Sequence, residues 1–294
     1  MIQSKAKFTW LDLPLILMLT VGCGWFLYRV NSQVSYPWNW SVIPQYILRF
    51  DETAARWVPG LITQGVITTL RLSLWATILA FVFGTVMGLL RTGRSHLGRM
   101  FGWGYVELIR NIPVLVWIFI FYYFISDQLM QAIQIEETLR NAPALVQSTV
   151  ALLIAKPSQI SIYLSGIIAL AVYEGAYVTE IIRAGIQSVD KGQWEASAAL
   201  GFSRMQQMRH VVFPQAFRTI LPPLAGQFIS TIKDSAIVSV ISIQELTFQG
   251  MELMAATFMT FEIWITIMVL YLILCLICSL SVDRLEIYLK RRTA

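Results

Sequence analysis

The chain has 294 residues, of which 56% are hydrophobic and only 13% are charged, with a formal net charge of +5. Soluble domains carry about 25% charged residues, so this composition excludes a water-soluble globular protein. The basic residues border apolar runs instead of forming a patch with interleaved aromatic residues, so the positive charge does not indicate a nucleic-acid partner.

Six apolar runs are long enough to cross a membrane as helices, which requires about 20 residues each. In chain order, these predicted spans are Leu11–Tyr28, Arg71–Leu90, Trp103–Ile125, Gln159–Ile182, Ile220–Ile243 and Ile263–Val282. A mixed segment, Arg29–Gly60, follows the first span, and a weakly amphipathic stretch, Ser126–Ser158, follows the third. We therefore expect an all-α polytopic membrane protein with about six transmembrane helices.

Lysine and arginine are concentrated in alternate connecting segments. They are most frequent before the first run, after the second, between the fourth and fifth, and after the sixth. Because such residues accumulate on the cytoplasmic side of a membrane, both termini are predicted to be cytoplasmic. The connection between the fourth and fifth spans is predicted to lie on the same side.

Small residues recur every four positions in the second predicted span, at Ala80, Gly84 and Gly88. This spacing places them on one helix face, where they allow two helix backbones to approach closely within a membrane. The stripe predicts a structural helix contact. It carries no information about a solute or a reaction.

Energy-converting and catalytic motifs are absent from the sequence. There is no G-x-x-x-x-G-K-[ST] segment to hold nucleotide phosphates. His96 and His210 are isolated, and Cys275 and Cys278 lie within an apolar run without the four ligands of a zinc site. We therefore expect no catalytic residue, no metal site and no cofactor in this chain.

The connection between the fourth and fifth spans, residues 183–215, is long for a loop between helices. Glu195–Leu200 favours a helix, Gly201 can end it, and Ser203 can cap a second segment. That second segment carries the apolar residues Met205, Met208 and Val212. Two interpretations are open on this pattern: a helix lying on the membrane surface, or a docking element for a soluble partner.

The same connection contains a motif. Its residues are Glu195, Ala196, Gly201, Val211, Phe213 and Pro214. In type and spacing they resemble the EAA loop of permease subunits of ATP-binding cassette importers, with conservative departures at Val211, at Phe213 and at Ser197, which stands in place of the second alanine.

Further matches, over roughly residues 60–290, resemble the polar amino-acid subfamily of these permeases. They include Thr69-Leu70-x-Leu72-Ser73, Arg110-Asn111-x-Pro113, Ala176-Tyr177-x-x-Glu180-x-x-Arg183, Leu221-Pro222 and Ile232-Lys233-Asp234-Ser235. The resemblance implies a permease domain over residues 60–294, with the five-helix core of type I importers. Residues 1–59 then form an additional N-terminal helix and an external segment.

The resemblance also implies a function and partners. The chain would form the translocation path of an ATP-driven amino-acid importer in the bacterial inner membrane, with two ATPase subunits that bind ATP and Mg. A second permease chain, identical or homologous, and an external solute-binding protein would complete the importer. Within the loop, Glu195 and Ala196 would contact the ATPase, Gly201 would permit the turn between two short helices, and Pro214 would fix the entry into the fifth span.

Polar residues within the spans are candidates for the solute path, because a charge at mid-bilayer is costly and is expected to face protein or water. The candidates are Glu174, Tyr177, Lys233, Asp234 and Ser235. The alternative for such residues is internal ion pairing between helices. It is equally consistent with Lys233 and Asp234, and it is favoured for Glu180 and Arg183.

Two segments, Ser126–Ser158 and Gln244–Glu262, are candidate landing surfaces for the solute-binding protein. Two other functions are also consistent with the sequence. A secondary transporter driven by an ion gradient would use Glu174 or Asp234 as a relay, and a non-transporting scaffold would use the cytoplasmic loop only to bind a partner.

Overall fold

The computed structural model describes residue 10 and residues 12–33, 36–53 and 55–291. The chain forms two compact units, the first ending at Trp40 and the second beginning at Ser41. The first contains helix α1, Asp12–Gln33, whose 22 residues measure about 33 Å, close to the thickness of the hydrocarbon core of a bilayer. The predicted first span, Leu11–Tyr28, begins at a residue that lies outside the described residues. A membrane crossing by this segment, which would be the sixth of the chain, stays a prediction.

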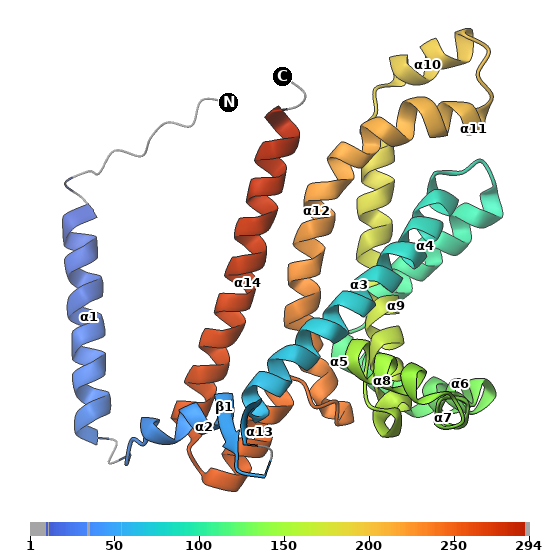
Figure 1. Cartoon of the computed structure of the whole chain (residues 1–294). Helices are drawn as coiled ribbons and strands as arrows, with labels where there is room; N and C mark the ends of the chain where they lie inside the picture. The colour runs from blue at the N-terminus through green and yellow to red at the C-terminus, as the bar shows by residue number, and fades with distance from the viewer. Residues whose placement is uncertain (1–9, 11, 34–35, 54, 292–294) are drawn as a thin grey trace. The chain divides into compact units, whose positions relative to one another are not determined.

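Five helical segments of the second unit, within the described residues, are long and apolar enough to cross a membrane. They are Leu61–Thr92, Val114–Ile133, Pro157–Gln187, Arg204–Ile241 and Thr260–Arg284. Their long helices are α3 (Leu61–Thr92), α9 (Ile160–Gln187), α12 (Phe213–Asp234) and α14 (Thr260–Arg291), all visible in Figure 1. The predicted all-α polytopic class is confirmed.

The third predicted span, Trp103–Ile125, is wrong in its placement. The chain forms a separate helix α4, His96–Arg110, and the span runs from Val114 through α5 (Val114–Ile120), the π-helical η2 (Phe121–Ser126) and α6 (Asp127–Ile133). The break falls at Pro113, which has extended backbone angles (φ −56°, ψ 136°) and cannot donate a helix hydrogen bond. Apolar residues lie on both sides of this proline, and the prediction joined them into one span although Arg110 and Asn111 stand just before the break.

The shorter elements connect these spans. They are η1 (Trp40–Val42), α2 (Ile43–Ile47), β1 (Leu48–Asp51), β2 (Arg56–Pro59), α7 (Ile135–Arg140), α8 (Ala144–Leu153), η3 (Pro157–Gln159), η5 (Ser235–Ile241) and α13 (Leu246–Thr257). Strands β1 and β2 pair antiparallel, with Leu48 opposite Pro59 and Asp51 opposite Arg56. This hairpin is an addition to the predicted helices. The compact units divide after residue 40, so residues 41–59 group with the second unit. The domain boundary predicted between residues 59 and 60 stays a prediction.

Helices α3 and α9 pack most closely at the small-residue stripe. A Cβ atom added to Gly84 would lie 2.6 Å from Val178 Cβ, and one added to Gly88 would lie 2.7 Å from Ile182 Cγ2. Ala80 is fully buried on the same face. Only glycine therefore fits at these two positions without a shift of the backbones, and the contact fixes α9 against α3.

The two ends of α9 carry different structures, as Figure 1 shows. At its start, Ile160 and Tyr163 share a hydrophobic cluster with Leu139 of α7. At its end the chain continues into helices α10 (Lys191–Ala199) and α11 (Arg204–Gln206). Since α9 lies within a predicted membrane span, these two groups of elements face opposite sides of the membrane.

Glu245 joins α13 to its neighbours from a fully buried position. Its carboxylate accepts hydrogen bonds from the backbone N–H groups of Thr247 (2.9 Å) and Phe248 (2.8 Å) and from the Tyr271 hydroxyl of α14 (2.8 Å). Burial nevertheless dominates and raises the pKa of Glu245 to about 7, because desolvation penalises the charged form more than these bonds favour it.

The raised pKa of Glu245 predicts a pH-dependent stability. The folded state holds the proton more tightly than the unfolded state, so this group stabilises the fold fully below its ordinary pKa, and that contribution is lost as the pH rises through about 7. We expect the unfolding temperature of the purified chain in detergent to fall from pH 5 to pH 8. The fall should be smaller in Glu245→Gln, which stays neutral, and an equal fall in both proteins would contradict the assignment.

Candidate functional site

The connection between α9 and α12 begins with a capped helix. Asp190 precedes α10, and its Oδ1 accepts a hydrogen bond from the backbone N–H of Gly192 (2.6 Å). The helix ends at Ala199, and Gly201 follows with φ +78°. A left-handed residue after a helix reverses the chain, and glycine adopts it without a steric penalty. Gly201 therefore lies at the turn between the two short helices.

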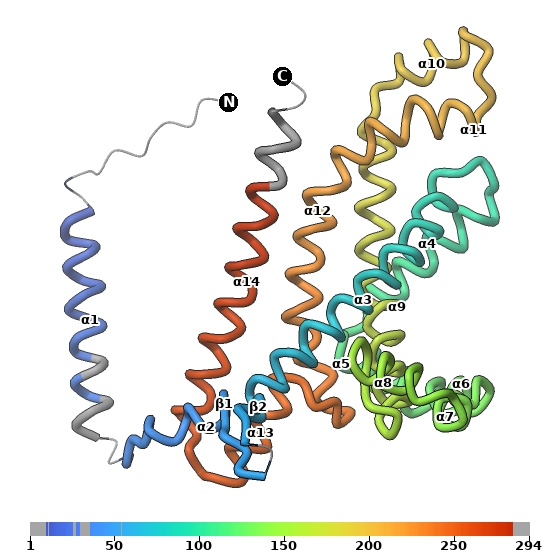
Figure 2. Tube along the Cα trace, in the orientation of Figure 1, coloured from blue at the N-terminus to red at the C-terminus, as the bar shows by residue number. Residues whose placement is uncertain are grey.

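The second helix of this connection continues into a membrane span. Ser203 and Gln206 form a reciprocal capping box, in which Gln206 N–H donates to Ser203 Oγ (3.4 Å) and Ser203 N–H donates to Gln206 Oε1 (2.8 Å). Helix α11 then passes through the π-helical η4 (Gln207–Val212) directly into α12 (Figure 2). Pro214 lies in the first turn of α12, directly after the π-helical η4.

One face of this connection packs on its own chain. Trp194 packs against the buried cluster that contains Val212 and Ala216, and the Arg204 guanidinium lies 4.8 Å from the centre of the Trp194 ring. The amide of Gln215 on α12 donates to Gln193 of α10 (3.2 Å). Helix α10 is thereby attached to the start of α12.

The opposite face is uncovered. Glu195 and Ala196 are exposed, and Leu200 and Met205 expose 77% and 76% of their surfaces. Large exposed apolar side chains on a segment that also exposes a carboxylate are typical of a protein–protein contact. We refer to Glu195, Ala196, Leu200 and Met205 as the docking face.

A buried carboxylate lies between α9 and α12. Glu174 on α9 has no exposed surface, and Gln227 on α12 donates a hydrogen bond to its Oε2 atom. Its Oε1 atom has no hydrogen-bond partner among the described residues. The half-buried Asp234, farther along α12, interacts electrostatically with Glu174. Two acidic groups and an amide therefore converge on one region, which favours a cationic or hydrogen-bond-donating ligand.

Tyrosines continue this region along α9. The hydroxyls of Tyr173 and Tyr177 are 3.2 Å apart. The guanidinium of Arg110, at the end of α4, lies 5.2 Å from the centre of the Tyr177 ring, within the range of a cation–π contact. Arg110 therefore places a positive charge at the ring of Tyr177.

The other two candidates for the solute path lie differently. Lys233 is exposed, and no described salt bridge joins it to Asp234. Ser235 is buried, and its hydroxyl donates to the backbone carbonyl of Ile232 (2.8 Å). The structure thus brings Glu174, Tyr177 and Asp234 toward one region, and it leaves Lys233 at the surface and turns the Ser235 hydroxyl to its own backbone.

An ion cluster joins α3 to the end of α9. Glu180 pairs with Arg91 of α3 and with Arg183 one turn along α9, whose Nε and Nη2 atoms lie 2.9 and 2.8 Å from Glu180 Oε2. Arg183 also donates to Gln187. The interpretation of Glu180 and Arg183 as an internal ion pair agrees with this geometry. The described residues hold no group of three side chains suited to a metal ion.

Two functional positions escaped the sequence analysis. Gln227 contacts Glu174 across 53 residues of sequence, and Arg91 reaches Glu180 from another helix. Gln227 did carry a signal, because an amide in a membrane span needs a polar partner. For Arg91 no such signal existed, because arginines at helix ends commonly extend to the membrane surface.

Comparison with known proteins decides the class. Residues 80–294 match the family described as the binding-protein-dependent transport system inner membrane component. The chain belongs to this family. The permease is 31% identical over 243 residues to the glutamine transport system permease protein GlnP of Escherichia coli K12, covering 81% of this chain and 97% of that protein. It is 30% identical over 241 residues to the glutamate/aspartate import permease protein GltJ of the same strain, covering 82% and 90%.

Solved structures agree on the fold of the permease. An amino acid ABC transporter crystallised with histidines superposes with a TM-score of 0.65 at 30% identity, over 85% of this chain and 99% of that one. The methionine transporter MetNI, in an inward-facing form, superposes with a TM-score of 0.58 at 20% identity, over 78% and 96%. The prediction of a membrane permease of an ATP-driven importer, a transport component without enzymatic chemistry of its own, is confirmed.

Proposed function

We propose that this permease forms the translocation path of an amino-acid importer, in which ATPase subunits act on the docking face and the solute passes Glu174. The observation that carries the proposal is the continuity of the chain from the docking face, through α11 and η4, into α12. A displacement of the docking face is then transmitted to the helix that contributes Gln227 and Asp234 to the solute region.

The docking face suits a soluble ATPase better than a membrane surface. A helix lying on a bilayer inserts its apolar side chains and keeps its charges in water. Here the same short connection exposes Glu195 together with Leu200 and Met205, and an acidic residue is poorly placed next to anionic headgroups. A protein partner can bind Leu200 and Met205 in an apolar groove and pair Glu195 with a basic side chain.

The acidic region between α9 and α12 suits an amino acid. The unpartnered Oε1 of Glu174 can accept a hydrogen bond from the solute ammonium, and Arg110 near Tyr177 supplies a positive charge for a carboxylate. Relatives named for glutamine and for glutamate and aspartate support this class of solute.

The remaining assembly follows from family membership. Importers of this family work with ATPase subunits and a solute-binding protein. We assign two ATPase subunits with bound ATP and Mg, a second permease chain of the same or a related sequence, and cytoplasmic termini. The segments 126–158 and 244–262 are at the end of α9 opposite the docking face (Figure 1), where an external solute-binding protein would land.

The test is uptake by the complete importer reconstituted in vesicles. We expect amino-acid uptake to require ATP hydrolysis and to persist when an uncoupler removes the ion gradient. Uptake that survives ATP depletion but stops with the uncoupler would favour a secondary transporter. A complex that assembles and hydrolyses ATP without moving any amino acid would favour a scaffold.

A further inference from the structure

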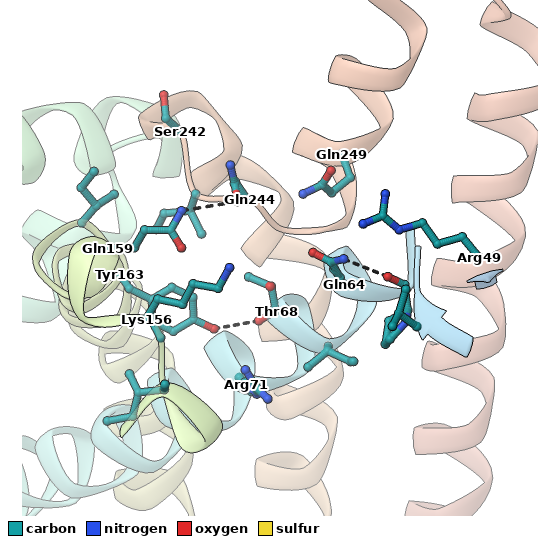
Figure 3. Close-up of a pocket in the computed structure, with 18 of the residues that line it drawn as sticks. Arg49, Gln64, Thr68, Arg71, Lys156, Gln159, Tyr163, Ser242, Gln244 and Gln249 are labelled. Carbon is teal, nitrogen blue, oxygen red and sulfur yellow. Dashed lines mark hydrogen bonds between the residues drawn. The ribbon is translucent and has the colours of Figure 1, made fainter. Parts of the chain in front are cut away.

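A cavity of about 640 Å³ lies at the start of α3 and α9, at the end opposite the docking face. Its walls come from six parts of the fold: the β1–β2 hairpin, α3, the segment from the end of α8 through η3, the start of α9, the segment after η5, and α13 (Figure 3). The volume is within the roughly 300–1,000 Å³ of small-molecule sites. It is large enough for an amino acid and is separate from the region around Glu174.

The charge of this cavity is strongly positive. Its lining includes the basic residues Arg49, Arg56, Arg71 and Lys156, and a single acidic one, Asp51. None of the four takes part in a salt bridge within the described residues. Figure 3 shows Lys156 and Arg49 directed toward the cavity from opposite sides. Unpaired cations around a concave, partly desolvated space attract an anion.

A buried acceptor completes the wall. Gln249 on α13 is only 3% exposed, and its side-chain Oε1 has no hydrogen-bond partner among the described residues. Leaving a buried carbonyl without a hydrogen bond is destabilising, and a ligand with an N–H donor removes this cost. The cavity thus offers cations for a carboxylate and an acceptor for an ammonium or amide group.

Neutral amides form the rest of the polar lining. Gln159 donates to Gln244 (3.4 Å), and Gln64 donates to the Pro59 carbonyl (2.9 Å), so these side chains are held in place. The Tyr163 hydroxyl donates to the Thr68 carbonyl (2.9 Å) and joins α9 to α3 beside the cavity. Apolar residues such as Ile67, Ile154 and Ile243 complete the lining, and this mixture of charged, amide and apolar groups suits a small solute with charged and apolar parts, such as an amino acid.

We propose that this cavity is an entry site that binds the carboxylate of the transported amino acid through Arg71 and Lys156, with Gln249 accepting from its N–H donors. The inference rests on the proposed function, because it takes the solute to be an amino acid. Tyr163 and Glu174 are 11 residues apart on α9, or about 16 Å. The solute therefore meets the cationic cavity first, which binds its carboxylate. It meets the acidic region around Glu174 second, which binds its ammonium group.

The test measures binding of L-glutamine and L-glutamate to the purified full-length chain in detergent, by calorimetry, in a Glu174→Gln background that weakens the second site. We expect Arg71→Gln and Lys156→Gln each to weaken binding by about tenfold or more, as for the loss of one charge-assisted hydrogen bond. Arg94→Gln removes the same charge just beyond the opposite end of α3 and should leave binding unchanged. L-Glutaminamide, which lacks the α-carboxylate, should bind no better to the parent protein than to Arg71→Gln.

Several outcomes overturn the proposal. They are failure of the folded parent protein to bind either amino acid, equal affinity in Arg71→Gln and Arg94→Gln, and binding of phosphatidylglycerol in place of the amino acids. Unfolding temperatures separate lost binding from lost folding, and Gln249→Leu provides a second variant that changes no charge. If uptake requires ATP and these variants bind normally, the entry site is wrong and the proposed function stands. If the cavity binds glutamine and ATP drives no uptake, the proposed function is wrong and the entry site stands.

Discussion

Replacement of Glu195 by lysine is expected to abolish ATP-driven uptake while the chain still inserts into the membrane. Glu195 is exposed on the docking face, so the substitution disturbs no internal contact of the permease. A partner that binds this face must pair the carboxylate, and a lysine there meets a like charge, which costs several kcal/mol. We expect uptake in reconstituted vesicles to fall by about 100-fold or more, with the ATPase subunits no longer co-purifying.

Asp283→Lys is the matched control for this experiment. Asp283 is exposed on α14 and lies outside the docking face, so the same charge reversal should leave uptake near the wild-type rate. The amount of each variant in the membrane fraction reports insertion. Wild-type uptake in Glu195→Lys would remove the docking face from the transport mechanism.

Replacement of Glu174 by glutamine is expected to reduce uptake with little effect on assembly. The side chain keeps its size and can still contact Gln227, but it can no longer pair with an ammonium group as a carboxylate. A charge-assisted hydrogen bond contributes about 1.5–3 kcal/mol, so we expect uptake at limiting solute to fall by about 10- to 100-fold. ATP hydrolysis by the assembled complex without solute should be unchanged.

The control for this second prediction is Thr179→Val on the same helix. Thr179 is buried, and its hydroxyl donates to the Gly175 carbonyl within α9 (2.7 Å), so it has no role in the solute path. Its uptake should stay close to that of the wild type. If Glu174→Gln transports as well as this control, Glu174 is a structural residue, and Asp234 would have to bind the solute alone.

The sequence was sufficient for features that depend on neighbours in the chain. Three predicted apolar runs lie within observed helical spans, and a fourth, Ile220–Ile243, extends only two residues past the end of its span, because burial in a membrane imposes a continuous apolar composition. The turn at Gly201 and the cap at Ser203 were predictable for a similar reason, since both satisfy backbone groups within a few residues.

Contacts between distant segments could not be predicted in this way. The pair of Glu174 and Gln227 depends on how α9 lies against α12, and the entry cavity assembles residues from six segments. The hairpin of β1 and β2 has too few residues to produce an alternating pattern. The third predicted span was misplaced for a different reason. The prediction joined apolar residues on both sides of Pro113 and missed the helix break there.

The close contact of Gly84 and Gly88 with α9 has a consequence for motion. Two helices that interlock through backbone and β-carbon atoms cannot slide past each other without opening the contact, so α3 and α9 are expected to travel as one rigid body. Helix α12 contains Pro222 and Pro223, which weaken its internal hydrogen bonding and make it the easier helix to bend. Alternating access is therefore expected to arise from α12 bending relative to the α3–α9 pair, which keeps its internal geometry.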